Sequence, residues 1–143
     1  MSPRATEEVQ KRILIIDDDA DIAMIISELI SQLSIPDLYF AIETANSGKQ
    51  GLELLHKKKF DLLITDLRMP ELPGDHLIQE LRIGNSENRM VPVILLSGYL
   101  KDLANSSSIQ SLPGTLYILE KPVQYGDLSQ VIQIWLGEVN SKL

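Results

Sequence analysis

Five side chains that could do chemistry stand where short apolar runs of the sequence end. Asp17 and Asp18 follow the run at 13–16, and Asp66 follows the run at 62–65. Ser97 follows the run at 93–96, and Lys121 lies just after the run at 116–119. Such runs, bounded by polar or turn residues, are typical of strands buried on both faces of a parallel sheet. Ligands of open sheets bind beyond the carboxyl ends of the strands. If the four strands are neighbours, we expect these side chains to converge in one crevice.

The residue types in this crevice predict phosphoryl transfer to an aspartate. Three carboxylates close together repel one another, and a divalent cation relieves that repulsion. A ligand set made only of oxygen atoms suits Mg²⁺, or Mn²⁺, better than zinc, and Asp17 or Asp18 with Asp66 can supply it. The metal, the lysine and the serine hydroxyl together would cradle a phosphoryl group. A carboxylate inside that cradle can act as the nucleophile and form an acyl phosphate.

Length and composition narrow the class of protein. At 143 residues the chain is long enough for one domain with a substantial core. Its 44% hydrophobic and 23% charged residues are ordinary for a globular protein. The net charge of -7 argues against a nucleic-acid partner or an anionic membrane surface. Because cysteine is absent, disulfides and thiolate metal sites are excluded, which fits a cytoplasmic location.

The ends of the chain are expected to be simple. Residues 1–10 are polar and lack the apolar core of a signal peptide, so they predict a short disordered lead-in. The sequence holds no apolar stretch long enough to span a bilayer. We expect residues 11–143 to form one domain, with no output domain after it.

Strand and helix patterns alternate along the chain, which predicts a doubly wound α/β architecture. Period-two or continuous apolar runs predict strands at about 12–16, 39–44, 61–65, 93–96 and 116–119. Helical spacing of apolar residues predicts helices at about 20–33, 47–57, 75–83 and 126–140, with a weaker helix within 99–112. The apolar stripe of the helix at about 20–33 contains Ile22, Ile25 and Ile26. An aspartate such as Asp19 is expected to cap the start of this helix.

The sequence resembles the receiver domain of two-component response regulators over nearly its whole length, from about residue 12 to residue 140. Each matching motif is weak alone, but all of them in this order are highly specific. The motifs are Ile13-Leu14-Ile15-Ile16-Asp17-Asp18-Asp19, Asp66-Leu67-Arg68-Met69-Pro70, Pro73-Gly74, Leu96-Ser97-Gly98 and Lys121-Pro122. The resemblance implies a flavodoxin-like (βα)5 sandwich whose parallel strands lie in the order 2-1-3-4-5.

The resemblance also implies roles for the acids. Asp66 would be the phosphoacceptor, and Asp17 and Asp18 would be the acidic pair that holds Mg²⁺ with it. The backbone carbonyl of Arg68 would complete the protein's share of the metal ligands. Ser97 and Lys121 would contact the phosphoryl oxygens.

The resemblance implies a signalling module rather than an enzyme, although one that supports its own phosphorylation and dephosphorylation. The donor would be a sensor histidine kinase or a histidine phosphotransfer protein, and a downstream protein would be the effector. The face from about residue 101 to 140 would change shape, and the state would be a monomer or a phosphorylation-dependent dimer. A cis bond is implied between Lys121 and Pro122.

One departure from the family pattern and two variable positions bear on function. The aromatic residue usual three positions before the lysine is replaced by Ile118, with Tyr117 one residue earlier. Because adjacent strand residues face opposite sides, Tyr117 is not expected to swing toward Ser97. Arg68 and Tyr99 occupy two variable positions, two residues after Asp66 and two after Ser97. The resemblance implies that side chains at these positions stand where an attacking water must approach. Because both are bulky, we expect slow self-dephosphorylation.

Two other functions remain open. Asp17 and Asp19 have the spacing of a Mg²⁺-dependent phosphatase or phosphotransferase with an aspartyl nucleophile on its first strand. Such an enzyme needs a cap over its substrate, and the chain shows no obvious insertion for one. The other alternative is a receiver-like scaffold that is not phosphorylated.

Overall fold

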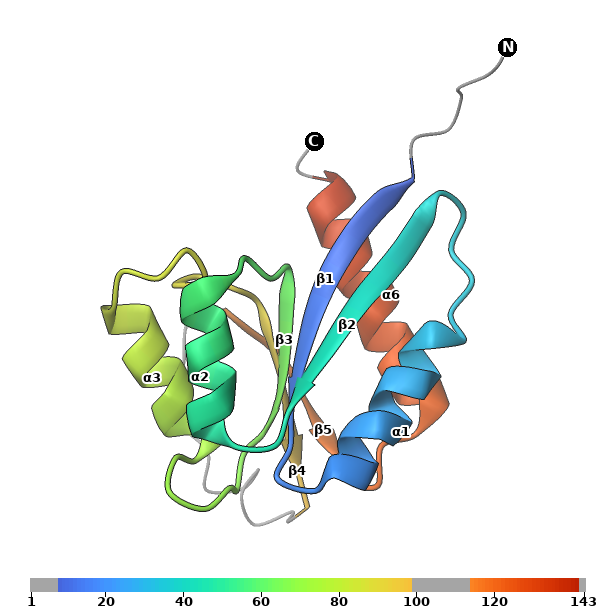
Figure 1. Ribbon diagram of the computed structural model, residues 1–143. Helices are drawn as coiled ribbons and strands as arrows, with labels where there is room; N and C mark the ends of the chain where they lie inside the picture. The colour runs from blue at the N-terminus through green and yellow to red at the C-terminus, as the bar shows by residue number, and fades with distance from the viewer. Residues whose placement is uncertain (1–7, 99–113, 142–143) are drawn as a thin grey trace.

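The structure is a computed structural model that describes residues 8–98 and 114–141. Its five strands form one parallel sheet in the order β2-β1-β3-β4-β5, which confirms the predicted fold class (Figure 1). The strands are β1 (Val9–Ile16), β2 (Leu38–Ala45), β3 (Leu62–Asp66), β4 (Val93–Ser97) and β5 (Thr115–Glu120). The four strands expected to carry the functional residues, β1, β3, β4 and β5, are neighbours in this order.

Helices cover both faces of the sheet (Figure 1). They are α1 (Ala20–Ser31), α2 (Gly48–Lys57), α3 (Gly74–Ile83) and α6 (Tyr125–Ser141). Helices α2 and α3 pack on one face, and α1 and α6 pack on the other. The weaker helix predicted within 99–112 lies outside the described residues. In the part of the chain that is described, none of the helices has the length and apolar character needed to cross a membrane.

Each apolar run supplies both cores because its residues alternate between the two faces of the sheet. Leu14 and Ile16 of β1 belong to the cluster beneath α2 and α3, whereas Ile13 and Ile15 belong to the cluster beneath α1 and α6. All four side chains are completely buried. This two-sided burial explains why the strands are continuous in apolar residues rather than alternating.

Strand β1 begins at Val9, three residues earlier than the apolar pattern predicts. Val9 and Gln10 were expected in the disordered lead-in, but they pair with Leu38 and Tyr39 of β2. The backbone carries this extension, since the Val9 amide donates to the Asp37 carbonyl at 2.8 Å. The Val9 side chain stays half exposed, so its hydropathy gives no signal of the strand.

Side chains cap two of the helices as the sequence indicates. The Asp19 carboxylate accepts hydrogen bonds from the amides of Asp21 and Ile22, which fixes the start of α1. The Ser47 hydroxyl accepts one from the Gln50 amide at 3.0 Å and caps α2. Because α1 begins directly after the acidic motif, this cap also ties the helix to the functional end of β1.

At the opposite end of the sheet, the buried side chain of Asn88 joins three segments of the chain. Its Oδ1 accepts from the Phe60 amide at 2.8 Å, and its Nδ2 donates to the carbonyls of Leu55 and Lys58. Asn88 therefore connects the end of α2 and the approach to β3 with the loop that precedes β4.

Replacing Asn88 by alanine is expected to lower the free energy of unfolding by about 3 kcal/mol, because it leaves buried backbone groups without partners. Urea denaturation of the wild type and the variant measures this loss. Asn85→Ala, at an exposed asparagine of the same loop, is the matched control and should change stability little. Equal effects of the two substitutions would contradict the assigned role of Asn88.

Candidate functional site: an acidic pocket at the carboxyl ends of the strands

Three carboxylates converge at the carboxyl end of the sheet, as the sequence predicts. Asp17 and Asp18 directly follow β1, and Asp66 is the last residue of β3. One oxygen of each carboxylate lies within 4.8 Å of the others. Asp17 and Asp66 are buried, whereas Asp18 is exposed at the mouth of the pocket. These three oxygens could hold one cation from the protein side.

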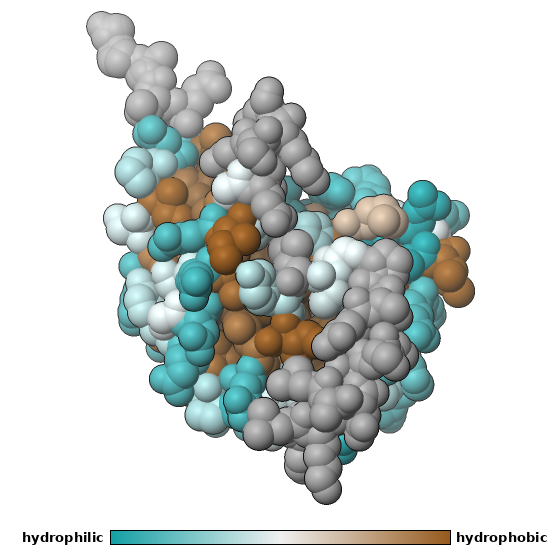
Figure 2. Space-filling model, turned by 180° about the vertical axis from the view of Figure 1, so that it is seen from behind, coloured by the Kyte–Doolittle hydropathy of each residue, from teal (hydrophilic) through white to brown (hydrophobic). Residues whose placement is uncertain are grey.

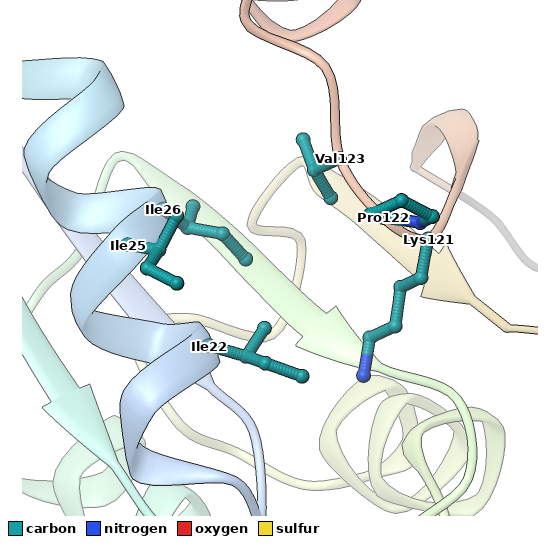
Figure 3. A pocket seen from close by; sticks show the side chains of 6 residues that line it. All are labelled: Ile22, Ile25, Ile26, Lys121, Pro122 and Val123. Atoms are coloured by element: carbon teal, nitrogen blue, oxygen red, sulfur yellow. The ribbon is translucent and has the colours of Figure 1, made fainter.

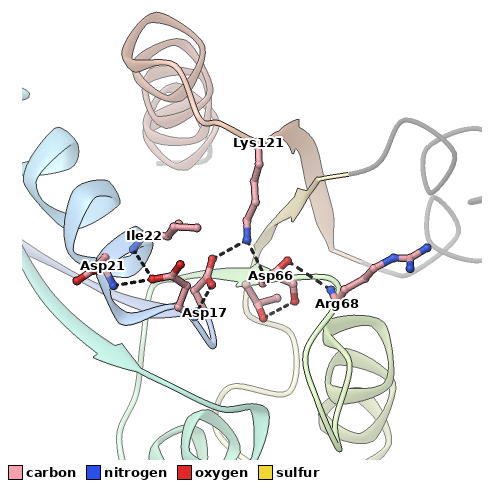
Figure 4. A network of polar contacts seen from close by, with 8 residues as sticks. Asp17, Asp21, Ile22, Asp66, Arg68 and Lys121 are labelled. Atoms are coloured by element: carbon pink, nitrogen blue, oxygen red, sulfur yellow. Dashed lines mark hydrogen bonds and ion pairs between the residues drawn. The ribbon is translucent and has the colours of Figure 1, made fainter.

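The ammonium of Lys121 lies between the two buried carboxylates (Figure 4). Its Nζ is 2.9 Å from Oδ2 of Asp17 and 2.9 Å from Oδ2 of Asp66. The backbone places this lysine, because the Lys121 amide donates to the Ser97 carbonyl at 2.7 Å and extends the β4–β5 ladder. The peptide bond from Lys121 to Pro122 is cis, in agreement with the resemblance.

Burial and charge set the protonation of this pocket. Burial raises the pKa of Asp66 above its ordinary value of 3.8; the Lys121 hydrogen bond opposes this rise, and the charge of Asp17 adds to it. Burial acts to lower the pKa of Lys121, but its close contacts and charge interactions with Asp66 and Asp17 outweigh burial and leave that pKa raised. Lys121 therefore stays charged, and its one positive charge faces two buried acids.

The two oxygens of Asp17 have different surroundings. Its Oδ1 accepts a hydrogen bond from the Asp19 amide at 2.9 Å. Its Oδ2 is buried and close to Lys121, but that contact is an ion pair without the geometry of a hydrogen bond, and no described group donates one to this oxygen. A buried carboxylate oxygen without a hydrogen bond, beside two other carboxylates, fits a hard divalent cation.

Ser97 and Arg68 flank Asp66. Ser97 is buried at the end of β4, the strand that pairs with β3. The Arg68 amide donates to Oδ1 of Asp66 at a long 3.4 Å. The Arg68 side chain is exposed and points away from Asp66 (Figure 4). Tyr99, which was expected to shield Asp66 from water together with Arg68, lies outside the described residues. Slow self-dephosphorylation therefore stays a prediction.

The register of β5 separates Tyr117 from Ser97. Tyr117 pairs with Ile94, whose side chain belongs to the core beneath α1 and α6. Ile118 packs against the core of the opposite face, on which Ser97 lies by strand alternation. Tyr117 is 43% exposed on its own face. The residue on the serine's side of β5 is therefore aliphatic, as the sequence indicates.

The turn between β3 and α3 depends on a contact that sequence reasoning did not find. A Cβ atom on Gly74 would collide with the backbone carbonyl of Asp66, so only glycine lets α3 begin at this point. Helix α3 accordingly starts one residue before the prediction. Pro73-Gly74 stood out as a motif, but its close approach to Asp66 has no signal in the sequence. Arg68, Met69, Pro70 and Pro73 of the turn line an open depression of about 430 Å³.

An apolar pocket of about 110 Å³ lies on the other side of Lys121, between α1 and the segment after β5 (Figure 3). Its lining includes Ile22, Ile25 and Ile26 of α1 and Pro122-Val123. Ile25 was expected in the apolar stripe of the helix, yet it is 54% exposed beside this pocket. The helical spacing identifies Ile25 as part of the apolar stripe of α1, but it does not show that this side of the stripe remains uncovered.

Asp66→Asn is expected to raise the free energy of unfolding at neutral pH without divalent cations. The raised pKa of Asp66 means that folding favours the protonated form. This contribution to stability is complete below the unfolded pKa and is lost as pH rises through the folded pKa. Asparagine is neutral at every pH and does not lose this stability as pH rises. The difference in the free energy of unfolding between the variant and the wild type should therefore become small in acid.

Chemical denaturation at neutral and acidic pH measures this difference, with Glu28→Gln as the control at an exposed acid of α1. A variant that is no more stable than wild type at neutral pH would contradict the proposed electrostatics of the pocket.

Comparison with known sequences assigns this architecture to a family. The model described as response regulator receiver domain matches residues 13–133. The chain is 32% identical over 133 residues to a probable transcriptional regulator ycf27 of Guillardia theta, covering 93% of this chain and 48% of that protein. It is 36% identical over 133 residues to a probable cyclic di-GMP phosphodiesterase of Vibrio cholerae, covering 93% and 28%. The chain thus spans about half or less of these curated relatives.

Solved structures agree with this assignment. A receiver domain protein from Clostridium thermocellum has a TM-score of 0.75 and 28% identity, with 93% of this chain and 99% of that chain covered. The receiver domain of the sensor histidine kinase PA1611 from Pseudomonas aeruginosa, described with a magnesium ion coordinated in the active site cleft, has a TM-score of 0.74 and 22% identity, covering 90% and 99%. The family match, the strand order and the acidic pocket together show that this chain belongs to the response regulator receiver domains.

Proposed function

We propose that the chain accepts a phosphoryl group on Asp66 from a phosphohistidine of a sensor histidine kinase or phosphotransfer protein. The observation that carries this proposal is the Lys121 ammonium between two buried carboxylates, 2.9 Å from each. The Lys121 ammonium can stabilise the negative charge on the Asp66 carboxylate before the transfer and the charge on the phosphoryl oxygens after it. The phosphorylated chain then acts on a downstream protein by contact, in the cytoplasm.

We propose that the pocket takes Mg²⁺, with Mn²⁺ as a possible substitute. Asp17, Asp18 and Asp66 would hold the ion, and the Arg68 backbone carbonyl would complete the protein's ligands. The buried Oδ2 of Asp17, which accepts no hydrogen bond from the described residues, supports this assignment. When bound, the ion supplies positive charge that offsets the repulsion between the acids and the phosphoryl oxygens. A magnesium ion is named for the related PA1611 domain as well.

The side chains of the pocket have distinct tasks in the transfer. A carboxylate oxygen of Asp66 attacks phosphorus, the phosphorus–nitrogen bond of the donor breaks, and its electron pair stays on the imidazole nitrogen. Lys121 exchanges its contact with Asp66 for a phosphoryl oxygen, and the Ser97 hydroxyl donates to another. Asp17 keeps Lys121 oriented during this exchange, because its Oδ1 is fixed by the Asp19 amide.

The apolar pocket of Figure 3 offers a place for the phosphodonor to dock. It lies beside Lys121 and brings together the exposed Ile25 of α1 with Pro122 and Val123. An apolar side chain of a donor seated there would be next to the acidic pocket without covering it. Exposed apolar surface at such a position favours a protein partner over a small substrate.

The structure offers less support for the phosphatase alternative. That mechanism needs Asp17 as nucleophile and Asp19 as its acid, but the Asp19 carboxylate caps α1 through two backbone amides. Asp17 is itself completely buried and bonded to the Asp19 amide. The scaffold alternative is weakened because suitable side chains occupy the acidic and basic positions of the pocket.

Incubation with a small phosphodonor should add one phosphoryl group to the wild type in the presence of Mg²⁺, as measured by intact mass. Asp66→Ala should gain none, because its carboxylate is the acceptor. A chelator should suppress the gain in the wild type.

A phosphoryl gain that Asp66→Ala retains would reject Asp66 as acceptor. Turnover of a phosphate ester that is lost in Asp17→Asn but kept in Asp66→Ala would favour the phosphatase. Partner binding without any phosphoryl gain in the wild type would favour the scaffold.

A further inference from the structure

The loop between α3 and β4, residues 84–92, lies at the end of the sheet opposite the acidic pocket (Figure 1). Polar side chains of this loop fix it to the last turn of α2. The half-buried Ser86 hydroxyl donates to the Leu55 carbonyl at 2.6 Å, and Nδ2 of the buried Asn88 donates to the same carbonyl at 2.7 Å. Carbonyls of a last turn lack partners within their own helix, so the loop supplies what the helix end needs.

Arg82, near the end of α3, fixes the same loop at a second place. Its guanidinium donates to the carbonyls of Arg89 and Val91, both at 2.7 Å. Met90 lies between these two residues, and Ile83 directly follows Arg82. The side chains of Met90 and Ile83 are nevertheless 59% and 87% exposed. Two large apolar side chains therefore project into solvent from backbone that hydrogen bonds hold in place.

These two side chains differ from the scattered apolar residues of an ordinary protein surface. The Arg82 contacts bring the backbone of Met90 close to the end of the helix that carries Ile83. In Figure 2 the molecule is turned by 180°, so that α3 lies toward the right, and hydrophobic side chains protrude among hydrophilic ones at that edge. Methionine and arginine, the residue types at positions 90 and 89, are enriched where proteins contact one another.

The same end of the molecule is basic, although the chain as a whole is acidic. Residues 57–61 and 84–92 hold four basic and two acidic residues, whereas the whole chain holds 13 basic and 20 acidic ones. The two segments are in contact, because Nζ of Lys59 donates to the Glu87 carbonyl at 3.1 Å. The basic residues of both segments therefore belong to one surface.

Most of this positive charge is not compensated within the chain. Lys58 forms an ion pair with Glu43 at 3.0 Å. Lys59 contacts a neutral carbonyl, so its charge remains. Within residues 8–98 and 114–141, neither Lys57 nor Arg89 forms an ion pair, and both side chains are exposed.

We propose that the surface formed by Lys57, Lys59, Ile83, Arg89 and Met90, the amino-end surface, binds a segment of a partner protein in which acidic residues flank an apolar side chain. The net charge of -7 makes the chain repel acidic groups as a whole, so the local positive charge directs them to this end. The exposed apolar side chains favour a protein segment over a nucleic acid or a lipid headgroup, which offer charge but no apolar side chain to bury.

Such a partner would leave the chemistry of the domain free. The amino-end surface and the acidic pocket lie at opposite ends of the sheet (Figure 1). The bound segment would cover neither Asp66 nor the apolar pocket beside Lys121. The amino-end surface would therefore hold the domain to its partner whether or not Asp66 carries a phosphoryl group, and the inference does not depend on the proposed phosphoryl transfer.

Two matched pairs of substitutions test this surface with a labelled synthetic peptide in which leucine alternates with aspartate and glutamate. Met90→Ser and Met24→Ser remove the same side chain at the same exposure of 59%, but only the first lies at the amino-end surface. Arg89→Gln and Lys49→Gln each remove an exposed positive charge. Fluorescence anisotropy should show that Met90→Ser and Arg89→Gln each weaken binding roughly threefold, whereas Met24→Ser and Lys49→Gln leave it unchanged.

Amide chemical shifts of the wild type, measured by NMR during the same titration, should change within 57–59 and 83–91, and Asp66→Ala should bind the peptide as the wild type does. No binding by the wild type overturns the proposal, as do shifts confined to another surface or equal weakening by both members of a pair. Equal binding of a peptide with asparagine and glutamine in place of the acids also overturns it. Tighter binding of phosphatidylserine vesicles or of an RNA oligonucleotide at the same residues would assign the surface to that class of partner instead.

Discussion

The contact of Lys121 with two buried carboxylates is the interaction on which the rest of the site depends. Asp17 and Asp66 come from different strands and are nearly inaccessible to water, so their charges cannot be stabilised by solvent. One ammonium at 2.9 Å from each offsets part of that cost. Burial and the charge of Asp17 nevertheless raise the pKa of Asp66, although the Lys121 hydrogen bond opposes the rise. A divalent cation held by the three carboxylates would add the positive charge that the lysine alone does not supply.

The fold provides this arrangement through the order of its strands. In the order β2-β1-β3-β4-β5, the strand ends that carry Asp17, Asp66, Ser97 and Lys121 are consecutive neighbours. Backbone bonds across the strand ends, such as that from the Lys121 amide to the Ser97 carbonyl, then set the height of each side chain above the sheet. The glycine at position 74 lets α3 begin against the Asp66 carbonyl. The pocket is thus formed by rigid elements, which hold its side chains in fixed positions.

Much of this could be predicted from the sequence because the informative residues are buried on both sides or stand at strand ends. Continuous apolar runs identify β1, β3 and β4, and the polar residue after each marks its functional end. The beginning of β1 at Val9 was not predictable, since backbone pairing extends the strand where side chains are exposed. Asn88 gave no signal either, because a lone asparagine in a loop is usually solvated, whereas this one is buried and bonded to three backbone groups.

We propose that the three acids form one cation site and that buried Asp17 belongs to it, although Lys121 already contacts Asp17. Calorimetric titration with Mg²⁺ on wild type, Asp17→Asn and Asp21→Asn tests this claim without any phosphodonor. We expect one ion per wild-type chain, affinity at least about tenfold lower in Asp17→Asn, and little change in Asp21→Asn, whose exposed carboxylate lies on the first turn of α1. Unchanged affinity in Asp17→Asn would contradict the account.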